Sequence, residues 1–325
     1  MIGSRDEEEL ERHYALVTRL LAESRVVPFL GAGANLCGRP LPGSWQDGAP
    51  FLPSGAELSN YLKRNWEDCT ETDLTRVAQW ISEMGGSGDL FNSLHALFDR
   101  DYPPTHLHTF LAGLPAVMAQ RCSAPRYQLI VTTNYDDLLE QAFIAAGEPF
   151  DLVTYVSDGS ARGKFRHTPP GGDSRLIDIP NQYRDVATER RTVILKIHGA
   201  VTRRLPDGDG DSYVITEDHY IDYLTRTELA NLVPVTLAAK LRKCHFLFLG
   251  YGLRDWNMRV ILHRIAGEQG LKYKSWAIQR QPTELDQKFW ERRDVDIIDV
   301  DLERYIQRLD ARLRTAPDPA THGRE

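Results

Sequence analysis

Hydrophobic residues near the N-terminus recur at helical spacings. The four that set the pattern, at intervals of four, three and four residues, are Leu10, Tyr14, Val17 and Leu21. This pattern predicts a helix that ends near Ser24 and packs one face on the core. The apolar run 25–30 comes next and stops at Gly31-Ala32-Gly33-Ala34. A short apolar run that meets glycines predicts a buried strand with a tight turn, which a ligand can approach closely.

Strand-like runs and helical segments alternate along the rest of the chain. The further strands are predicted over 127–133, 152–156, 192–197, 245–249, 275–279 and 295–300. A capping-box pattern at Ser54-Gly55-Ala56-Glu57 predicts the start of a helical insert that runs to about residue 120, and a last helix is predicted over 302–313. Such alternation predicts an α/β fold with a doubly wound, mainly parallel, Rossmann-like sheet covered on both faces. We expect one domain over 1–315 and a disordered tail over 316–325.

Composition and charge restrict the class of protein. Hydrophobic residues make up 42% of the 325 residues and charged residues 26%, which is typical of a globular chain. The net charge of −7 argues against direct binding to nucleic acid or to an anionic membrane, because both attract dense Lys/Arg faces. The start of the chain lacks the basic and apolar regions of a signal peptide, so we expect a cytoplasmic setting.

Candidate metal ligands are few and poorly spaced. The four cysteines, which form no C-x-x-C pair, are Cys37, Cys69, Cys122 and Cys244. Structural zinc and a disulfide framework are therefore not expected. His106 and His108 open an apolar helix, and the alternating Asp207, Asp209 and Asp211 lack the glycine and the glutamate of a calcium loop. We predict a solvated hairpin near these aspartates and no metal.

Four of the predicted strands end in glycine or polar residues. These strand ends are 31–35, 133–136, 196–199 and 250–255. Ligands of open α/β sheets bind at the carboxyl ends of strands, so we expect the four segments to line one crevice. The spacing of Gly31 and Gly33 lets backbone N–H groups face a pyrophosphate. Leu36 stands where the dehydrogenase fingerprint needs a third glycine, so the hydride-transfer form of the motif is incomplete.

The combination of these motifs resembles a known family. Gly-Ala-Gly at 31–33, Thr-Asn-Tyr-Asp at 133–136, Lys-Ile-His-Gly at 196–199 and Phe-Leu-Gly-Tyr-Gly at 248–252 look like those of the sirtuin-like NADases of bacterial antiphage defence. The resemblance covers nearly the whole chain. It implies an NAD glycohydrolase that cleaves the nicotinamide–ribose bond of its substrate NAD and depletes NAD on infection. It also implies control by homo-oligomerisation or by a separately encoded activator, such as an ATPase or an Argonaute-like protein.

The resemblance also assigns roles to individual residues. It places the catalytic pair at Asn134, which would position the ribose and a water, and His198, which would accept a proton. It implies that Asp136 binds the nicotinamide carboxamide. The full set that it implies for NAD binding is Gly31, Ala32, Gly33, Asn35, Thr133, Asp136, Gly250, Gly252 and Asp255. Two structural alternatives stand beside these roles: the segment 134–137 also has the composition of a helix N-terminus, and a histidine at a strand end is often a core residue.

The chain departs from the protein-deacetylating sirtuins at two points. Those enzymes carry a zinc ribbon of two C-x-x-C pairs, which this sequence lacks, and they usually have glutamine where Thr133 stands. The resemblance therefore favours water, or an internal hydroxyl, over an acyl-lysine as the acceptor. Two alternatives remain, a lysine deacylase and a non-catalytic module that senses NAD or ADP-ribose.

Overall fold

The computed structural model describes residues 4–39, 45–121, 127–203, 210–225, 229–252, 261, 263–265 and 271–315. Among these residues nine strands form one sheet, in the order β11-β10-β9-β1-β2-β6-β3-β4-β5. The strands are β1 (Val26–Leu30), β2 (Leu129–Thr132), β3 (Phe150–Tyr155), β4 (Phe165–Thr168), β5 (Arg175–Ile177), β6 (Thr192–Lys196), β9 (His245–Leu249), β10 (Ser275–Ile278) and β11 (Val295–Ile298). The seven predicted strands are all present.

The sheet is parallel from β11 to β3, and only the edge strands β4 and β5 run antiparallel. The chain leaves β1 for β2 on one side and later returns to β9 on the other, so the direction of winding reverses at β1. The predicted doubly wound, mainly parallel α/β fold is confirmed. A reversal of this kind opens a crevice at the carboxyl ends of the central strands, where ligands bind in open α/β sheets.

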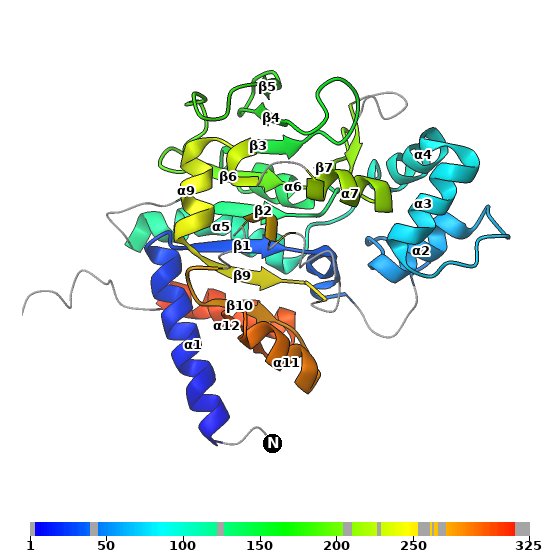
Figure 1. The fold of residues 1–325 in the computed structure, drawn as a ribbon. Helices are drawn as coiled ribbons and strands as arrows, with labels where there is room; N and C mark the ends of the chain where they lie inside the picture. Colours follow the sequence, from blue (N-terminus) through cyan, green and yellow to red (C-terminus); the bar gives the residue numbers. More distant parts are fainter. Residues whose placement is uncertain are drawn as a thin grey trace, which may run out of the picture.

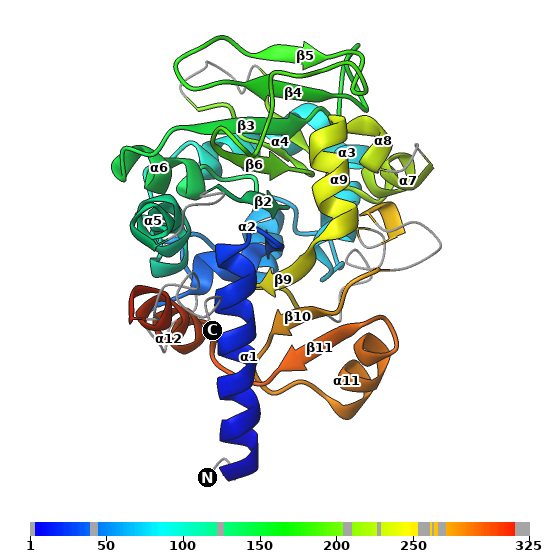
Figure 2. The ribbon, with the colours of Figure 1, turned by 90° about the vertical axis from the view of Figure 1, so that its left-hand side faces the viewer.

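Helices cover both faces of the sheet (Figure 2). The helices are α1 (Ser4–Ala22), α2 (Gly55–Lys63), α3 (Leu74–Gly85), α4 (Ser87–Phe98), α5 (His106–Arg121), α6 (Leu138–Ala145), α7 (Glu217–Thr225), α8 (Leu229–Leu232), α9 (Val235–Lys243), α11 (Glu284–Glu291) and α12 (Leu302–Thr315), with a 3-10 turn, η1, at Ala32–Leu36. One apolar layer joins the sheet to α1, α5, α6 and α12, and the opposite layer joins it to α7, α9 and α11. The burial of the central strands on both faces explains their uninterrupted apolar sequences.

The predicted helical insert forms a unit beside the carboxyl ends of the strands, toward which the arrowheads of β1 and β9 point (Figure 1). Helices α2, α3 and α4 pack in a third hydrophobic cluster, which also contains Leu138, Val201, Tyr213 and Ile215 from the rest of the chain. Ser54 caps α2 as predicted, because its side chain accepts the Glu57 N–H while the Glu57 carboxylate accepts the Ser54 N–H. Helix α5 differs from the other three, since its apolar side chains pack in the layer on the sheet.

The edge strands β4 and β5 were not predicted. Strand β4 alternates buried and half-buried residues, but one of its buried residues is His167, which hides the alternation of apolar side chains. That histidine bonds Asp151 at 2.9 Å and Tyr183 at 2.8 Å, so its burial is compensated by partners distant in sequence. A hairpin near Asp211 is present as β7 (Gly199–Ala200) paired with β8 (Ser212–Tyr213), but its strands are buried and not solvated as predicted. The Asp211 side chain is 2% exposed and accepts a hydrogen bond from the Tyr213 hydroxyl, while Asp207 and Asp209 lie outside the described residues.

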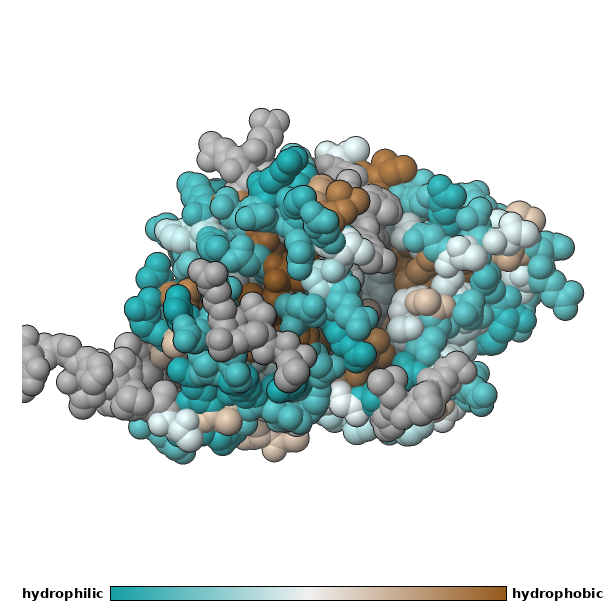
Figure 3. Space-filling model, turned by 90° about the horizontal axis from the view of Figure 1, so that it is seen from below, coloured by the Kyte–Doolittle hydropathy of each residue, from teal (hydrophilic) through white to brown (hydrophobic). Residues whose placement is uncertain are grey.

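Hydrophilic side chains dominate the face seen from below, and apolar residues there show only in small separate patches (Figure 3). Among the helices of the described residues, none combines the length and the apolar character that crossing a membrane requires. Two other predicted features, Asp255 and the tail 316–325, lie outside the described residues.

Candidate active site

A cavity of about 610 Å³ lies at the carboxyl ends of β9, β1, β2 and β6, which are neighbours in the sheet. The predicted site residues that line it are Ala32, Gly33, Asn35, Thr133, Asn134, Asp136, His198, Gly250 and Gly252. Gly31 lies in the same turn but is not part of the lining. The expectation that four strand ends line one crevice is therefore confirmed for the residues that the structure describes.

The insert supplies another wall of this cavity. Ser54, Gly55 and Ala56 at the start of α2 line it together with the loop 72–75. Arg39 anchors the chain that leads to α2, because its guanidinium donates two hydrogen bonds of 2.7 and 2.8 Å to the Glu57 carboxylate. The same contact holds the pKa of Glu57 well below its usual range.

The glycines after β1 and β9 bring two turns into contact. A Cβ on Gly33 would lie 2.7 Å from the Gly250 carbonyl oxygen, and one on Gly250, whose φ is +75°, would lie 2.1 Å from the Ala34 nitrogen. The Gly33 N–H donates to the Gly250 carbonyl at 2.8 Å, and the Gly31 N–H donates to the Leu249 carbonyl at 3.0 Å. These two N–H groups are thus occupied within the protein, which differs from the expectation that they face a pyrophosphate.

Asn134 is held just beyond the carboxyl end of β2 by two hydrogen bonds. Its side-chain Nδ2 donates to the Gly31 carbonyl at 3.2 Å, and its backbone N–H donates to Thr132 Oγ1 at 3.0 Å. The neighbouring Thr133 hydroxyl shares a hydrogen bond of 2.5 Å with the Tyr251 hydroxyl. The turns after β1, β2 and β9 are therefore joined around one side of the cavity, with the Asn134 amide facing it.

Asp136 combines a structural role with a place in the cavity lining. Its Oδ1 accepts the Leu138 N–H at 3.1 Å at the start of α6, and its Oδ2 accepts Nδ2 of Asn35 at 2.7 Å. The segment 134–137 therefore leads into a helix, as the structural alternative expected. Asn35 Oδ1 is buried and has no hydrogen-bond partner among the described residues, so its acceptor is available to a donor in the cavity.

His198 is buried at the base of the cavity, with 3% of its surface exposed. Its ring lies edge-on to Tyr220 and Tyr223, with centroids 5.4 and 5.6 Å away. Nε2 is buried and has no hydrogen-bond partner in the part of the chain that the structure describes. Burial, and then the positive charge of Arg264, lower the pKa of His198 to about 3, so the imidazole is neutral at physiological pH.

One residue near His198, Arg264, was missed by reasoning from the sequence. Arg264 is 2% exposed and stacks over Tyr223, with Cζ 3.9 Å from the ring centroid. Among the described residues, none provides a hydrogen-bond partner for the nitrogens of its guanidinium. The signal that was available is an arginine within the largely apolar segment 260–265. It did not show that this arginine would lie close to a histidine that precedes it by 66 positions.

A buried ion pair lies beneath the loop that carries Asn134 and Asp136. Lys196, which is 1% exposed, donates to Glu140 Oε1 at 2.7 Å and also to the backbone carbonyl of Asp136. Because Lys196 precedes His198 by two residues, one side chain connects the ends of β2 and β6. This contact fixes the catalytic candidates relative to each other.

The profile of the SIR2-like domain matches residues 128–298, which is more than half of the chain. The chain belongs to the SIR2-like family. It is 23% identical over 292 residues to defense-associated sirtuin 2 of Bacillus subtilis, and this match covers 87% of this chain and 24% of that protein. It is 28% identical over 251 residues to NAD(+) hydrolase ThsA of Acinetobacter baumannii, and this match covers 77% of this chain and 41% of that protein. The chain thus spans less than half the length of either relative.

The histidines and cysteines that were considered as metal ligands make other contacts in this SIR2-like chain. His106 begins α5, as predicted, and its Nδ1 lies 3.0 Å from Glu303 Oε1, while His108 Nδ1 lies 2.9 Å from the Thr105 hydroxyl. Cys37, Cys69 and Cys244 are buried free thiols. In the part of the chain that the structure describes, no three His, Cys, Asp or Glu residues are grouped so that they could hold a metal ion.

Proposed function

We propose that this SIR2-like domain hydrolyses NAD to nicotinamide and ADP-ribose. The observation that carries the proposal is the meeting of the Asn134 amide and the unpartnered Nε2 of His198 in one cavity at the crevice of the sheet. A neutral imidazole beside an amide suits a reaction in which a ribose must be held and a water positioned. The name of the Acinetobacter relative, NAD(+) hydrolase, supports the same substrate.

The proposed reaction breaks the bond between C1′ of the ribose and the nicotinamide nitrogen. The bonding electrons go to the nicotinamide ring, which leaves as a neutral molecule, and positive charge develops on the ribose. A water oxygen then bonds to C1′, and its proton passes to His198 Nε2 and on to solvent. The low basicity of His198 suits a sequence in which the nicotinamide bond breaks before the water loses its proton.

Recognition of the substrate is assigned to the rest of the cavity lining. Asn35 Oδ1, the free acceptor beside Asp136, would accept a hydrogen bond from the nicotinamide carboxamide, and Asp136 would orient Asn35. The tight turns at Gly33 and Gly250 leave no side chain between the sheet and the ligand, so the pyrophosphate of NAD could approach closely. Asn134 would hold the ribose hydroxyls.

The biological role that we propose is depletion of NAD during defence against phage, which the name of the Bacillus relative, defense-associated sirtuin 2, supports. Destruction of NAD must be restrained in a healthy cell. We therefore propose control by assembly, either of copies of this chain or with a separately encoded activator such as an ATPase or an Argonaute-like protein. We assign the protein no direct nucleic-acid or membrane partner, because its charge is acidic.

The decisive experiment follows nicotinamide, linear ADP-ribose and cyclic ADP-ribose by chromatography after incubation of NAD with the purified protein. Wild type is compared with Asn134→Ala, His198→Ala and a matched control, Asn92→Ala, whose side chain is exposed on α4. We expect nicotinamide and linear ADP-ribose from wild type and the control, with at least a 100-fold slower release from the two cavity variants.

Two other activities predict different results. A lysine deacylase would release nicotinamide only when an acetylated peptide is added, and it would form O-acetyl-ADP-ribose. A sensing module would bind NAD, as measured by calorimetry, without turnover at any protein concentration or with any activator. Either pattern would refute the hydrolase proposal.

A further inference from the structure

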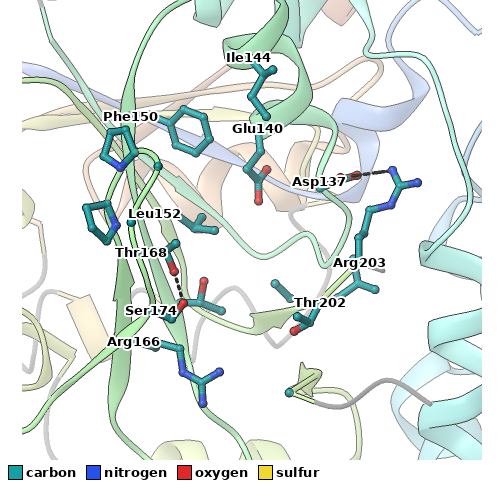
Figure 4. A pocket seen from close by; sticks show the side chains of 18 of the residues that line it. Asp137, Glu140, Ile144, Phe150, Leu152, Arg166, Thr168, Ser174, Thr202 and Arg203 are labelled. Atoms are coloured by element: carbon teal, nitrogen blue, oxygen red, sulfur yellow. Dashed lines mark hydrogen bonds and ion pairs between the residues drawn. The ribbon is translucent and has the colours of Figure 1, made fainter. Parts of the chain in front are cut away.

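A second cavity, of about 800 Å³, lies beside strands β3 and β4 (Figure 4). Helix α6, strands β3 and β4 and the segment 200–203 form its walls. Its apolar surface comes mainly from Ile144, Phe150, Leu152 and Pro169. Its volume falls in the range of sites that bind small organic molecules. None of the predicted NAD-binding residues lines it.

One end of this second cavity holds an unsatisfied acceptor. The Glu140 side chain projects from α6 into the cavity (Figure 4), and only 8% of the residue is exposed. Its Oε1 accepts the hydrogen bond from Lys196, but its Oε2 is buried and no described residue pairs with it. A buried carboxylate oxygen of this kind costs free energy until a donor reaches it. The cavity therefore calls for a ligand with an N–H group at this end.

The other end holds a cation. Arg166 is half-buried on β4 and lines the cavity, and the described residues provide no hydrogen bond or ion pair for its guanidinium. Arg203, by contrast, is already paired with Asp137 at 3.3 Å. A half-buried guanidinium favours a carboxylate or a phosphate, which it can bind through two hydrogen bonds. This end therefore calls for an anion.

The separation of the two groups restricts the ligand. Leu152 and Thr168 lie between Glu140 and Arg166 in the cavity (Figure 4). Thr168 and Arg166 are two positions apart on one strand, which places their Cα atoms roughly 7 Å apart. An α-amino acid carries both charged groups on one carbon, which suits two separated ends poorly. A longer molecule with an apolar or aromatic body between its polar ends can reach both.

We propose that this second cavity binds an organic anion with an apolar or aromatic body, whose N–H donor pairs with Glu140 while its carboxylate or phosphate pairs with Arg166. Two sources share this chemistry, aromatic amines with a carboxylate and nucleoside monophosphates with an amino group on the base. Lys196 contacts both Glu140 and the Asp136 carbonyl, so an occupant lies one side chain away from the loop of the candidate active site. An effect on turnover rests on the proposed function, whereas binding does not.

Calorimetric titration of the purified protein tests the binding. The probes are adenosine monophosphate, 4-aminobenzoate and adenosine, which lacks the anion. Arg166→Gln removes the proposed cation, and Arg166→Lys keeps the charge but loses the paired hydrogen bonds. Arg175→Gln is the matched control, because this substitution removes the same charge from an exposed residue on β5. Asn134→Ala reports binding in the NAD crevice instead.

We expect one or both anionic probes to bind wild type and Arg175→Gln equally. Affinity should fall about tenfold or more in Arg166→Gln and less in Arg166→Lys. Adenosine should not distinguish wild type from Arg166→Gln. The probe that binds identifies which of the two sources the cavity accepts. The proposal is overturned if neither anion binds, if Arg166→Gln binds like wild type, or if Asn134→Ala alone removes binding.

The effect on the candidate active site is measured separately. The rate of nicotinamide release is followed with and without the bound probe, in wild type and in Arg166→Gln. A change in rate that disappears in Arg166→Gln supports coupling through Lys196, and an unchanged rate in wild type refutes coupling. Absence of any turnover would contradict the proposed function and leave the calorimetric result unaffected.

Discussion

Asn35 donates a hydrogen bond from Nδ2 to Asp136 Oδ2 at 2.7 Å, and the two residues stand 101 positions apart in the chain. The bond ties the turn after β1 to the turn after β2 and aligns the free acceptor of Asn35 with the cavity. Asp136 is 5% exposed, so its carboxylate depends on such donors.

Replacement of this amide by a carboxylate should disrupt both turns. In Asn35→Asp two buried carboxylates face each other, and we expect the free energy of unfolding in urea to fall by about 2 kcal/mol. The exchanged double variant Asn35→Asp/Asp136→Asn restores one donor and one acceptor, so it should recover most of the loss. Equal stability of the single variant and wild type would show that the bond contributes nothing.

The contact between the glycine turns makes a second prediction. Gly250→Ala should lower the free energy of unfolding by about 3 kcal/mol, because φ is positive there and the new Cβ meets the Ala34 nitrogen. Gly252→Ala is the matched control, since a Cβ at that position meets nothing within 4 Å. Urea unfolding of both variants measures the difference, and equal losses would contradict the proposed contact.

The free energy of unfolding should depend strongly on both partners of the buried ion pair. Lys196→Met leaves the Glu140 carboxylate buried without its cation, and we expect a loss of about 3–5 kcal/mol. The double variant Lys196→Met/Glu140→Met removes both charges and should be more stable than the single variant. A double variant that is no better than Lys196→Met would show that the apolar replacements, not the orphaned charge, cause the loss.

The buried histidines predict how stability depends on pH. Burial lowers the pKa of His13 and of His108 to about 4 and contributes most to the value of about 3 for His198. Between pH 6.5 and about 4 the folded protein therefore binds fewer protons than the unfolded chain, and its stability falls as the pH falls. At pH 5 each of the three should cost about 2 kcal/mol relative to pH 7.

Replacement of His198 by a residue that does not titrate isolates its contribution to this pH dependence. His198→Phe keeps an aromatic ring between Tyr220 and Tyr223, so its free energy of unfolding should decrease less between pH 7 and pH 5 than that of wild type. Urea unfolding at the two pH values gives the comparison. The same decrease in both proteins would mean that His198 titrates alike in the folded and unfolded states.

Much of the fold and of the cavity floor was predictable because it depends on local sequence. The buried strands are unbroken apolar runs, and the strand His245–Leu249 has the predicted bounds. Four strand ends meet at the crevice because parallel neighbours end at the same edge of a sheet. Lys196 illustrates what was not predictable. Its partner Glu140 is 56 positions away, and neither residue belongs to a pattern that would announce the pair.

The composition of the cavity walls bears on how this protein can diversify. The strand ends supply the floor with Asn134 and His198, whereas one wall comes from α2 and the segment 72–75, which belong to an insert that packs in a hydrophobic cluster separate from the two layers on the sheet. Residues of that unit can change without repacking the sheet. Selection can therefore alter which molecules enter the cavity, and how widely it opens, while the residues that the proposed function assigns to the ribose stay the same.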